Sequence, residues 1–212
     1  MRILIVAATA AEVDPCLSRM KARAGIDVLV TGVGMVATAV RCAEALTRQK
    51  YDLALNLGVC GSFDPSLQPP AAVHVVSDRL AELGAEDGER FLTIQELHLL
   101  GDDEFPFRGG RLVNDAPPVS TALSALPAVN GITINTVHGN ERSIDAVVRR
   151  FHPQVESMEG GAFMYACLVQ GVPFAQVRAV SNVVERRNRG AWKLREAIDN
   201  LNATALDIIG HL

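Results

Sequence analysis

The sequence predicts an α/β protein in three layers, with helices on both faces of a twisted, mixed and mostly parallel sheet. Short continuous apolar runs alternate with helix-length amphipathic runs, which is typical of strands covered on both faces. Aromatic residues make up only 5% of the chain, so Ala, Val and Leu must fill most of the core. The 212 residues suit one well-buried domain better than two. Without a repeat or linker, we predict a single domain over residues 1–212.

The first third of the chain alternates strand and helix in order. Strands are predicted over 2–9, 27–31 and 52–57, and helices over 10–21 and 35–49. Thr9 is available to cap the first helix. Gly32-Val33-Gly34 follows the second strand and Gly58-Val59-Cys60-Gly61 follows the third, where we expect tight turns or close backbone approach to a ligand.

The rest of the chain is less regular in its middle part. Residues 80–112 read mainly as loop with marginal elements. The further predicted strands are 72–77, 132–137 and 174–180, and the further predicted helices are 141–151, 158–170 and 191–212. Right-handed crossovers would bring the carboxyl ends of parallel strands to one edge, where such sheets bind ligands.

Composition and charge exclude several classes of function. The net charge is −4, whereas duplex-binding proteins usually carry a basic face; the short cluster 186–189 reads as a solvated loop. No run reaches the roughly 20 apolar residues of a membrane helix. The four cysteines are widely spaced and form no CxxC pair, which argues against zinc and disulfides and favours the reducing cytoplasm.

No metal or cofactor is predicted. No His/Cys/Asp cluster has the spacing of metal ligands. Gly32-Val33-Gly34 does not complete a dinucleotide fingerprint, because Ala37 stands where the third glycine belongs.

Three charged residues are candidates for chemistry. Glu12 follows the first strand, where it could complement the helix dipole or serve as a catalytic carboxylate. Glu159 stands at the start of a helix. Arg178 lies near the end of a strong strand, and a buried arginine needs a partner because an unpaired buried charge is costly; a purely structural salt bridge would also satisfy it.

These residues, with their neighbours, resemble the purine nucleoside phosphorylase/nucleosidase superfamily, and within it the branch typified by methylthioadenosine/S-adenosylhomocysteine nucleosidase. The C-terminal third is most similar to the nucleosidases that cleave futalosine. The motifs that carry the resemblance run in family order: Glu12, Gly32-Val33-Gly34-Met35-Val36-Ala37, Gly58-Val59-Cys60-Gly61, Glu156-Ser157-Met158-Glu159-Gly160-Gly161-Ala162, and Arg178-Ala179-Val180-Ser181-Asn182.

The resemblance implies hydrolysis of the N-glycosidic bond of futalosine, with release of hypoxanthine and dehypoxanthinyl futalosine, a step toward menaquinone. It assigns Glu12 as the base that orients water and Arg178 as the group that holds this water or Glu12. Glu159 would accept hydrogen bonds from the ribose hydroxyls, and Met158 would pack on the sugar. Val59, Cys60, Gly61 and Ser181 would complete the binding site. A homodimer or larger homo-oligomer is also implied.

Asn182 is the departure that bears on the substrate. Relatives that act on adenine nucleosides have Asp at this place. An Asn side chain offers an NH₂ donor for O6 and a carbonyl acceptor, which suits a 6-oxopurine. The 31–39 segment contains no Arg or Lys, and phosphate binding usually needs such charge-assisted contacts, so water is the expected nucleophile.

Several alternatives remain open at this stage. The chain could be another purine nucleosidase or a phosphorylase, acting on methylthioadenosine, S-adenosylhomocysteine, aminodeoxyfutalosine or inosine, or a non-catalytic nucleoside-binding module. No base-stacking aromatic is evident near His138. Phe105, Phe107 or Phe163 could line the pocket, although core or loop packing is the simpler expectation for each.

Overall fold

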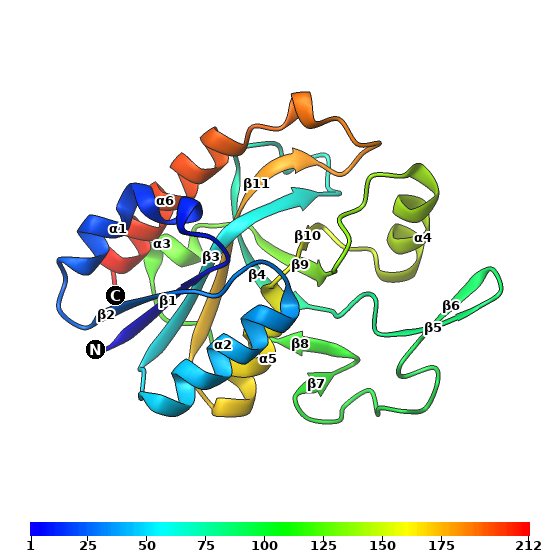
Figure 1. Cartoon of the computed structure of the whole chain (residues 1–212), viewed down its shortest axis with the longest axis horizontal. Helices are drawn as coiled ribbons and strands as arrows, with labels where there is room; N and C mark the ends of the chain where they lie inside the picture. Colours follow the sequence, from blue (N-terminus) through cyan, green and yellow to red (C-terminus); the bar gives the residue numbers. More distant parts are fainter.

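The computed structural model describes residues 1–212, apart from the side chain of Lys21. Its main sheet is twisted and mixed, and helices flank it on both faces (Figure 1), which confirms the predicted fold class. The strands of this sheet are β1 (Ile3–Ala7), β2 (Ile26–Val30), β3 (Leu53–Ser62), β4 (Ala72–Asp78), β7 (Phe107–Arg108), β8 (Arg111–Val113), β9 (Ala128–Thr133), β10 (Val155–Ser157) and β11 (Phe174–Val183). A separate hairpin, β5 (Gly84–Asp87) with β6 (Arg90–Thr93), projects from the body of the molecule.

Strand pairing closes part of the sheet into a ring. The path runs β2-β1-β3-β10-β9-β4-β8-β7, and β11 pairs with both β3 and β4. Strands β3, β10, β9, β4 and β11 therefore form a closed circuit of hydrogen-bonded neighbours. Within it β11 is parallel to β3 but antiparallel to β4, so the sheet is mixed where the ring closes.

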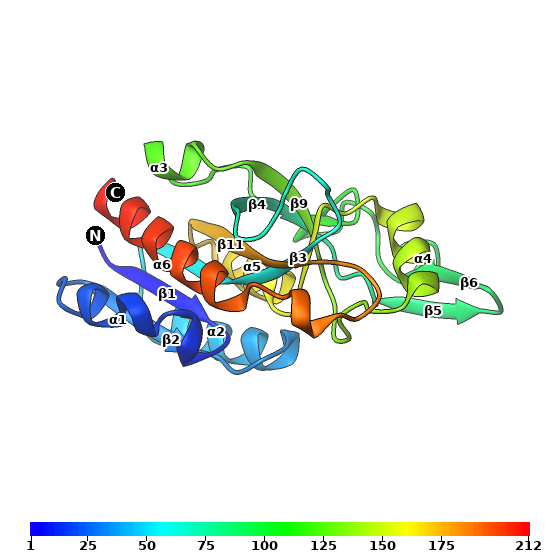
Figure 2. The same ribbon diagram turned by 90° about the horizontal axis from the view of Figure 1, so that it is seen from above.

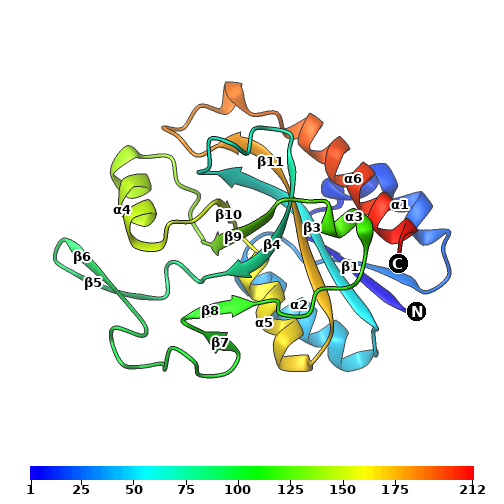
Figure 3. The same cartoon turned by 180° about the vertical axis from the view of Figure 1, so that it is seen from behind.

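Helices form the outer layers. On one face lie α1 (Asp14–Lys21), α3 (Thr121–Ser124) and α6 (Leu194–Gly210), and on the other lie α2 (Met35–Arg48) and α5 (Gly160–Gln170) (Figures 2 and 3). A further helix, α4 (Glu141–Phe151), lies beside the β5–β6 hairpin, away from these layers.

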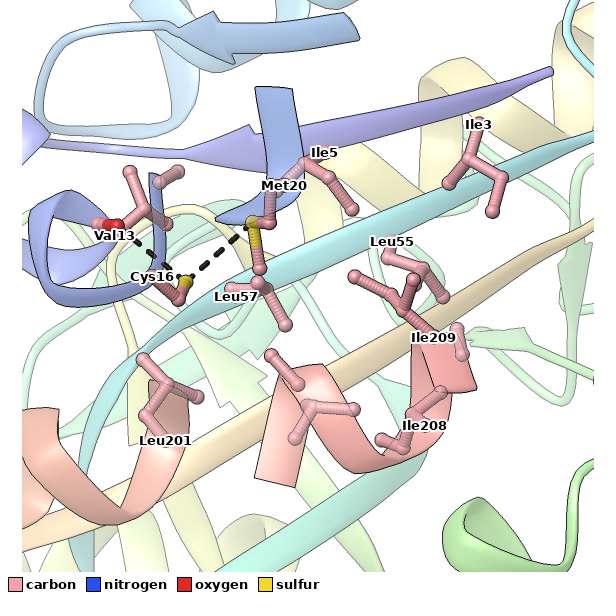
Figure 4. Packing of buried hydrophobic residues seen from close by; sticks show 14 of the residues in the cluster. Ile3, Ile5, Val13, Cys16, Met20, Leu55, Leu57, Leu201, Ile208 and Ile209 are labelled. Atoms are coloured by element: carbon pink, nitrogen blue, oxygen red, sulfur yellow. Dashed lines mark hydrogen bonds between the residues drawn. The ribbon is translucent and has the colours of Figure 1, made fainter. Parts of the chain in front are cut away.

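The core is divided by the strands because successive side chains point to opposite faces. Ile3 and Ile5 of β1, with Leu55 of β3, pack against Leu201 and Ile208 of α6 (Figure 4). Alternate residues of the same strands, such as Leu4, face α2 and α5 instead.

The first predicted helix, 10–21, is divided in two. Residues Ala10–Glu12 form a 3₁₀ turn, η1, and α1 begins at Asp14 after the non-helical Val13. Pro15 explains the restart, because a residue without an N–H suits the first turn of a helix and not its interior. The last helix also begins later than predicted, at Leu194, since 189–191 form a separate 3₁₀ turn and Lys193 N donates to Ser181 O.

Several strand boundaries also differ from the predictions. β9 ends at Thr133, and not near 137, because the amides of Asn135 and Thr136 donate to the Glu82 carboxylate instead of a neighbouring strand. β10 was not predicted, since a three-residue strand leaves no periodic signal. β3 continues through 58–61, where a turn was expected, and β11 continues to Val183. No helix in the described part of the chain is long and apolar enough to cross a membrane.

Candidate active site

A cavity of about 380 Å³ opens beyond the carboxyl end of β1, along the last residues of β3 and β11. Eight of the nine residues predicted from sequence line it, and they come from four separate segments of the chain: Glu12, Val59, Cys60, Gly61, Met158, Glu159, Ser181 and Asn182. The ninth, Arg178, is only 1% exposed and lies beneath the cavity. The edge at which parallel strands were expected to end is therefore where this cavity lies.

Glu12 is held in place by donors from two elements. Its Oε2 accepts from the backbone N (2.9 Å) and the hydroxyl (3.1 Å) of Thr9, and its Oε1 accepts from Val59 N at 3.2 Å. The 3₁₀ turn that interrupts the expected helix aims this carboxylate at the cavity. The two carboxylate oxygens offer about four lone-pair positions, and these three donors occupy three of them. A position therefore remains that can take a proton from water.

Arg178 is a deeply buried charge beneath the cavity. Its Nε donates to Gln176 Oε1 at 3.1 Å and its Nη2 donates to Asn56 Oδ1 at 2.5 Å. Its Nη1 lies 3.8 Å from Glu159 Oε2. The guanidinium passes over Gly58, its cross-strand partner, where a Cβ would collide with Nη1 and would lie 3.1 Å from Glu12 Oε1. Gly58 thus makes room for Arg178 between the two glutamates.

Glu159 links the glycine segment after β2 to the amino end of α5. Its Oε1 accepts from Gly34 N at 3.0 Å, and the residue itself is the N-cap of α5. Gly34 has a φ of 96°, a conformation that glycine adopts at little cost. The half-buried Met158 precedes Glu159 in the cavity wall, so a carboxylate and an apolar side chain lie side by side.

Ser181 and Asn182 both line the cavity because β11 bulges there. The register with β3 shifts between Val180 and Asn182, and such a bulge redirects side chains that would otherwise alternate. Ser181 Oγ donates to Asn182 Oδ1 at 2.8 Å, and Asn182 Nδ2 donates to Val183 O at 3.0 Å. One N–H of the amide remains available to a ligand.

Cys60 contributes an inert thiol to the wall. Burial raises the pKa of the Cys60 thiol to about 12, so the side chain stays protonated and is not a thiolate nucleophile.

Other polar groups at the site were not singled out by sequence reasoning. Asn56 and Gln176 hold Arg178, and Asp78 accepts from Gln176 Nε2 at 3.2 Å and from Thr133 Oγ1 at 2.8 Å. Burial raises the pKa of the Asp78 carboxyl to about 6. Polar residues at alternate positions of otherwise apolar strands were the available signal, since buried polar groups need partners.

Phe105, Phe107 and Phe163 follow the simpler expectation of core or loop packing. Phe107 and Phe163 are buried in the core between the sheet and α5, and Phe105 is exposed, so none of them lines the cavity. Trp192 and His138 do line it.

The chain belongs to the phosphorylase superfamily, whose family model matches residues 21–210. Two similar proteins within this superfamily have names that specify a substrate. A futalosine hydrolase of Streptomyces coelicolor is 35% identical over 199 residues, covering 89% of this chain and 78% of that protein. A futalosine hydrolase of Thermus thermophilus is 32% identical over 181 residues, covering 84% and 78%.

A solved structure agrees with the fold. The 5'-methylthioadenosine/S-adenosylhomocysteine nucleosidase from Colwellia psychrerythraea, in complex with adenine, superposes with a TM-score of 0.80. The alignment covers 99% of this chain and 95% of that one at 20% identity. At this identity the likeness establishes the architecture alone.

Proposed function

We propose that this chain hydrolyses the N-glycosidic bond of futalosine and releases hypoxanthine and dehypoxanthinyl futalosine, a step toward menaquinone. The observation that carries the proposal is its similarity, at 32–35% identity over most of the chain, to two futalosine hydrolases. Residues 1–212 act as one nucleosidase domain in this proposal.

The proposed reaction begins with a water molecule beside Glu12. Glu12 takes a proton from this water while the oxygen of the water bonds to C1′ of the ribose. The C1′–N9 bond breaks at the same time, and its electron pair leaves with the purine. Two donors to Glu12 Oε2 and one to Oε1 fix the orientation of the carboxylate, which favours proton transfer in one direction.

Glu159 and Arg178 act on the sugar side of the bond. Glu159 accepts hydrogen bonds from the ribose 2′ and 3′ hydroxyls, and its negative charge favours the cationic sugar that develops as the bond breaks. Arg178, 3.8 Å from Glu159, holds this carboxylate and offsets the charge of Glu12. Met158 packs against the sugar.

Asn182 acts on the departing base. Its free N–H donates to O6 of hypoxanthine and stabilises the negative charge that the base acquires. An aspartate here would face O6 with an acceptor, and an unpaired buried polar group costs about 1–3 kcal/mol. Asn182 therefore supports a 6-oxopurine as the substrate base.

Water, and not phosphate, is the proposed nucleophile. Among the residues that the structure describes, no Lys or Arg lines the cavity, whereas Glu12, Glu156 and Glu159 do. A phosphate dianion would be repelled by these carboxylates and would lack the cationic partners that it needs.

The second candidate is cleavage of a 6-amino nucleoside such as methylthioadenosine. The structural likeness to a nucleosidase solved with adenine is the observation that supports this second candidate. Asn182 favours the 6-oxo base, so this candidate stands second.

A homodimer in a reducing cytoplasm completes the proposal. The face formed by α2 and α5 carries exposed apolar side chains, including Val36 (74% exposed), Val40 (61%) and Val169 (48%). Burying such a patch against a second copy would remove apolar surface from water.

The four cysteines are free and buried, as suits a compartment that keeps thiols reduced.

Chromatographic assay of free base tests the proposal directly. Futalosine, inosine and methylthioadenosine are each incubated with the protein, with and without phosphate. Hypoxanthine released from futalosine without phosphate is the expected result. Adenine from methylthioadenosine, or a strict need for phosphate, would overturn it in favour of another reaction of the superfamily.

A further inference from the structure

Glu156 is a buried carboxylate in the cavity wall that the proposed reaction does not use. It lies on β10, is 4% exposed, and lines the cavity together with Asn182. Both of its oxygens contact His138: Oε1 accepts from the backbone N at 3.1 Å, and Oε2 lies 2.5 Å from Nδ1. The carboxylate is therefore fixed in one orientation.

Glu156 and Asn182 stand on either side of the same glycine. Gly61 of β3 is the cross-strand partner of Glu156 in β10 and also of Asn182 in β11. A Cβ at Gly61 would lie 3.3 Å from Asn182 Nδ2 and 3.4 Å from Glu156 Cγ. Val184 Cγ2 would be closer still, at 2.8 Å. Because Gly61 has no side chain, the side chains of Glu156 and Asn182 can approach each other at one end of the cavity.

The two side chains differ in hydrogen-bonding character in a way that matches one class of purine. An ionised carboxylate only accepts, whereas the Asn182 amide nitrogen donates. Along adjoining atoms, a 6-oxopurine presents a donor at N1–H and an acceptor at O6. A 6-aminopurine presents the reverse pattern, with an acceptor at N1 and a donor at the 6-amino group.

We infer that Glu156 is a specificity-determining residue that accepts a hydrogen bond from N1–H of a 6-oxopurine while Asn182 donates to O6. This inference rests on the proposed function, since it names the atoms of the base that the site recognises. His138 is a positioning residue in this arrangement, because its ring and backbone amide hold the carboxylate. An adenine in the same place would set its N1 lone pair against Glu156.

Calorimetric binding of the free bases tests the inference without requiring turnover. The wild-type protein is expected to bind hypoxanthine about tenfold or more tightly than adenine, the effect of one unpaired buried polar group. Glu156→Gln supplies an amide that can donate to N1 of adenine, so the ratio should fall by about tenfold or more. An unchanged ratio, or equal weakening of both bases, would overturn the inference.

Glu82→Gln is the matched control. Its carboxylate accepts from the amides of Asn135 and Thr136, in the segment that leads to His138, but it does not line the cavity. The control should leave the ratio of the two affinities unchanged. A fall as large as that of Glu156→Gln would mean that support of the segment, and not recognition of N1–H, sets the preference.

A second ligand tests the same contact in the unaltered protein. In 1-methylhypoxanthine a methyl group replaces the N1 hydrogen, so its affinity should be about tenfold or more below that of hypoxanthine. Equal affinity would overturn the inference even if the variant failed to fold. Hypoxanthine release from futalosine is measured in parallel. If futalosine is cleaved but Glu156→Gln leaves the ratio of hypoxanthine to adenine affinity unchanged, this inference alone is wrong. If that ratio changes as expected but futalosine is not cleaved, the proposed reaction alone is wrong.

Discussion

The two faces of β3 and β11 differ in what they bury. Toward α1 and α6 the strands present aliphatic side chains, such as Leu55 and Val177. Toward α2 and α5 the same strands present Asn56, Gln176 and Arg178, which are equally buried. Because alternate residues of one strand point in opposite directions, a single segment provides a packed core on one side and a polar network under the cavity on the other.

The comparison shows that burial has different consequences on the two faces. An aliphatic side chain stabilises the fold because its apolar surface is removed from water, and it needs no particular partner. A buried polar group stabilises the fold only while its partners are present, since an unpaired buried charge or donor is costly. Substitutions on the polar face should therefore affect both stability and chemistry, and those on the aliphatic face stability alone.

Arg178→Met should have the largest effect. It removes the donor to Asn56 Oδ1 and Gln176 Oε1 and the ion-pair partner of Glu159, and breaking a buried pair costs about 3–5 kcal/mol. Urea unfolding should report this loss, and kcat for futalosine should fall as well. Arg186→Met, at an exposed position, is the control. A loss below about 1 kcal/mol, as for a surface ion pair, would contradict the picture of an interdependent network.

Leu55→Ala is the corresponding change on the aliphatic face. Leu55 is 1% exposed and packs in the cluster drawn in Figure 4, so the cavity it leaves should cost about 2–5 kcal/mol. The kcat/KM of the folded enzyme for futalosine should stay unchanged at a temperature where the variant is folded. A large loss of kcat/KM without unfolding would show that the two faces are not separate in function.

Glu12→Gln should separate chemistry from ligand binding in the cavity. The amide keeps the size of the side chain but cannot take a proton from water, so kcat should fall by about 100-fold or more. Affinity for free hypoxanthine, followed by calorimetry, should change little. Activity close to that of the wild type would rule out Glu12 as the base.

Asn182→Asp should change selectivity more than rate. The new carboxylate accepts from a 6-amino group and repels O6, so kcat/KM for methylthioadenosine relative to futalosine should rise about tenfold or more. Competition assays with both nucleosides in one reaction measure the ratio. If the ratio does not move, position 182 does not contact the base.

The pH dependence of stability should show the smallest effect. The pKa of Asp78 is raised to about 6 by burial, above its unfolded value, so the folded state binds the proton more tightly. Stability should therefore fall as pH rises from 5 to 7, by on the order of 1 kcal/mol from this group. Asp78→Asn should remove this slope in urea unfolding at the two pH values. A slope that persists in the variant would assign it to other groups.

Much of the fold was predictable because apolar runs and their lengths carry the strand and helix signals. The glycine segments, Glu12, Glu159 and Arg178 were also recognisable from their place beside those runs. The bulge at Ser181 was not predictable, since it depends on how β11 registers with β3. Nor was Glu156, because β10 is too short to show a period and its side chain is defined by a partner, His138, 18 residues away.

The closed circuit of β3, β10, β9, β4 and β11 has a consequence for motion. A strand inside a ring has a hydrogen-bonded neighbour on each side, so it cannot fray from an edge as β2 or β7 can. Amide hydrogens there should exchange with solvent only through large-scale opening, whereas those of the β5–β6 hairpin should exchange through local opening. Gly61, Glu156 and Asn182 lie on three adjoining strands of this ring, so their spacing is maintained for as long as the protein stays folded.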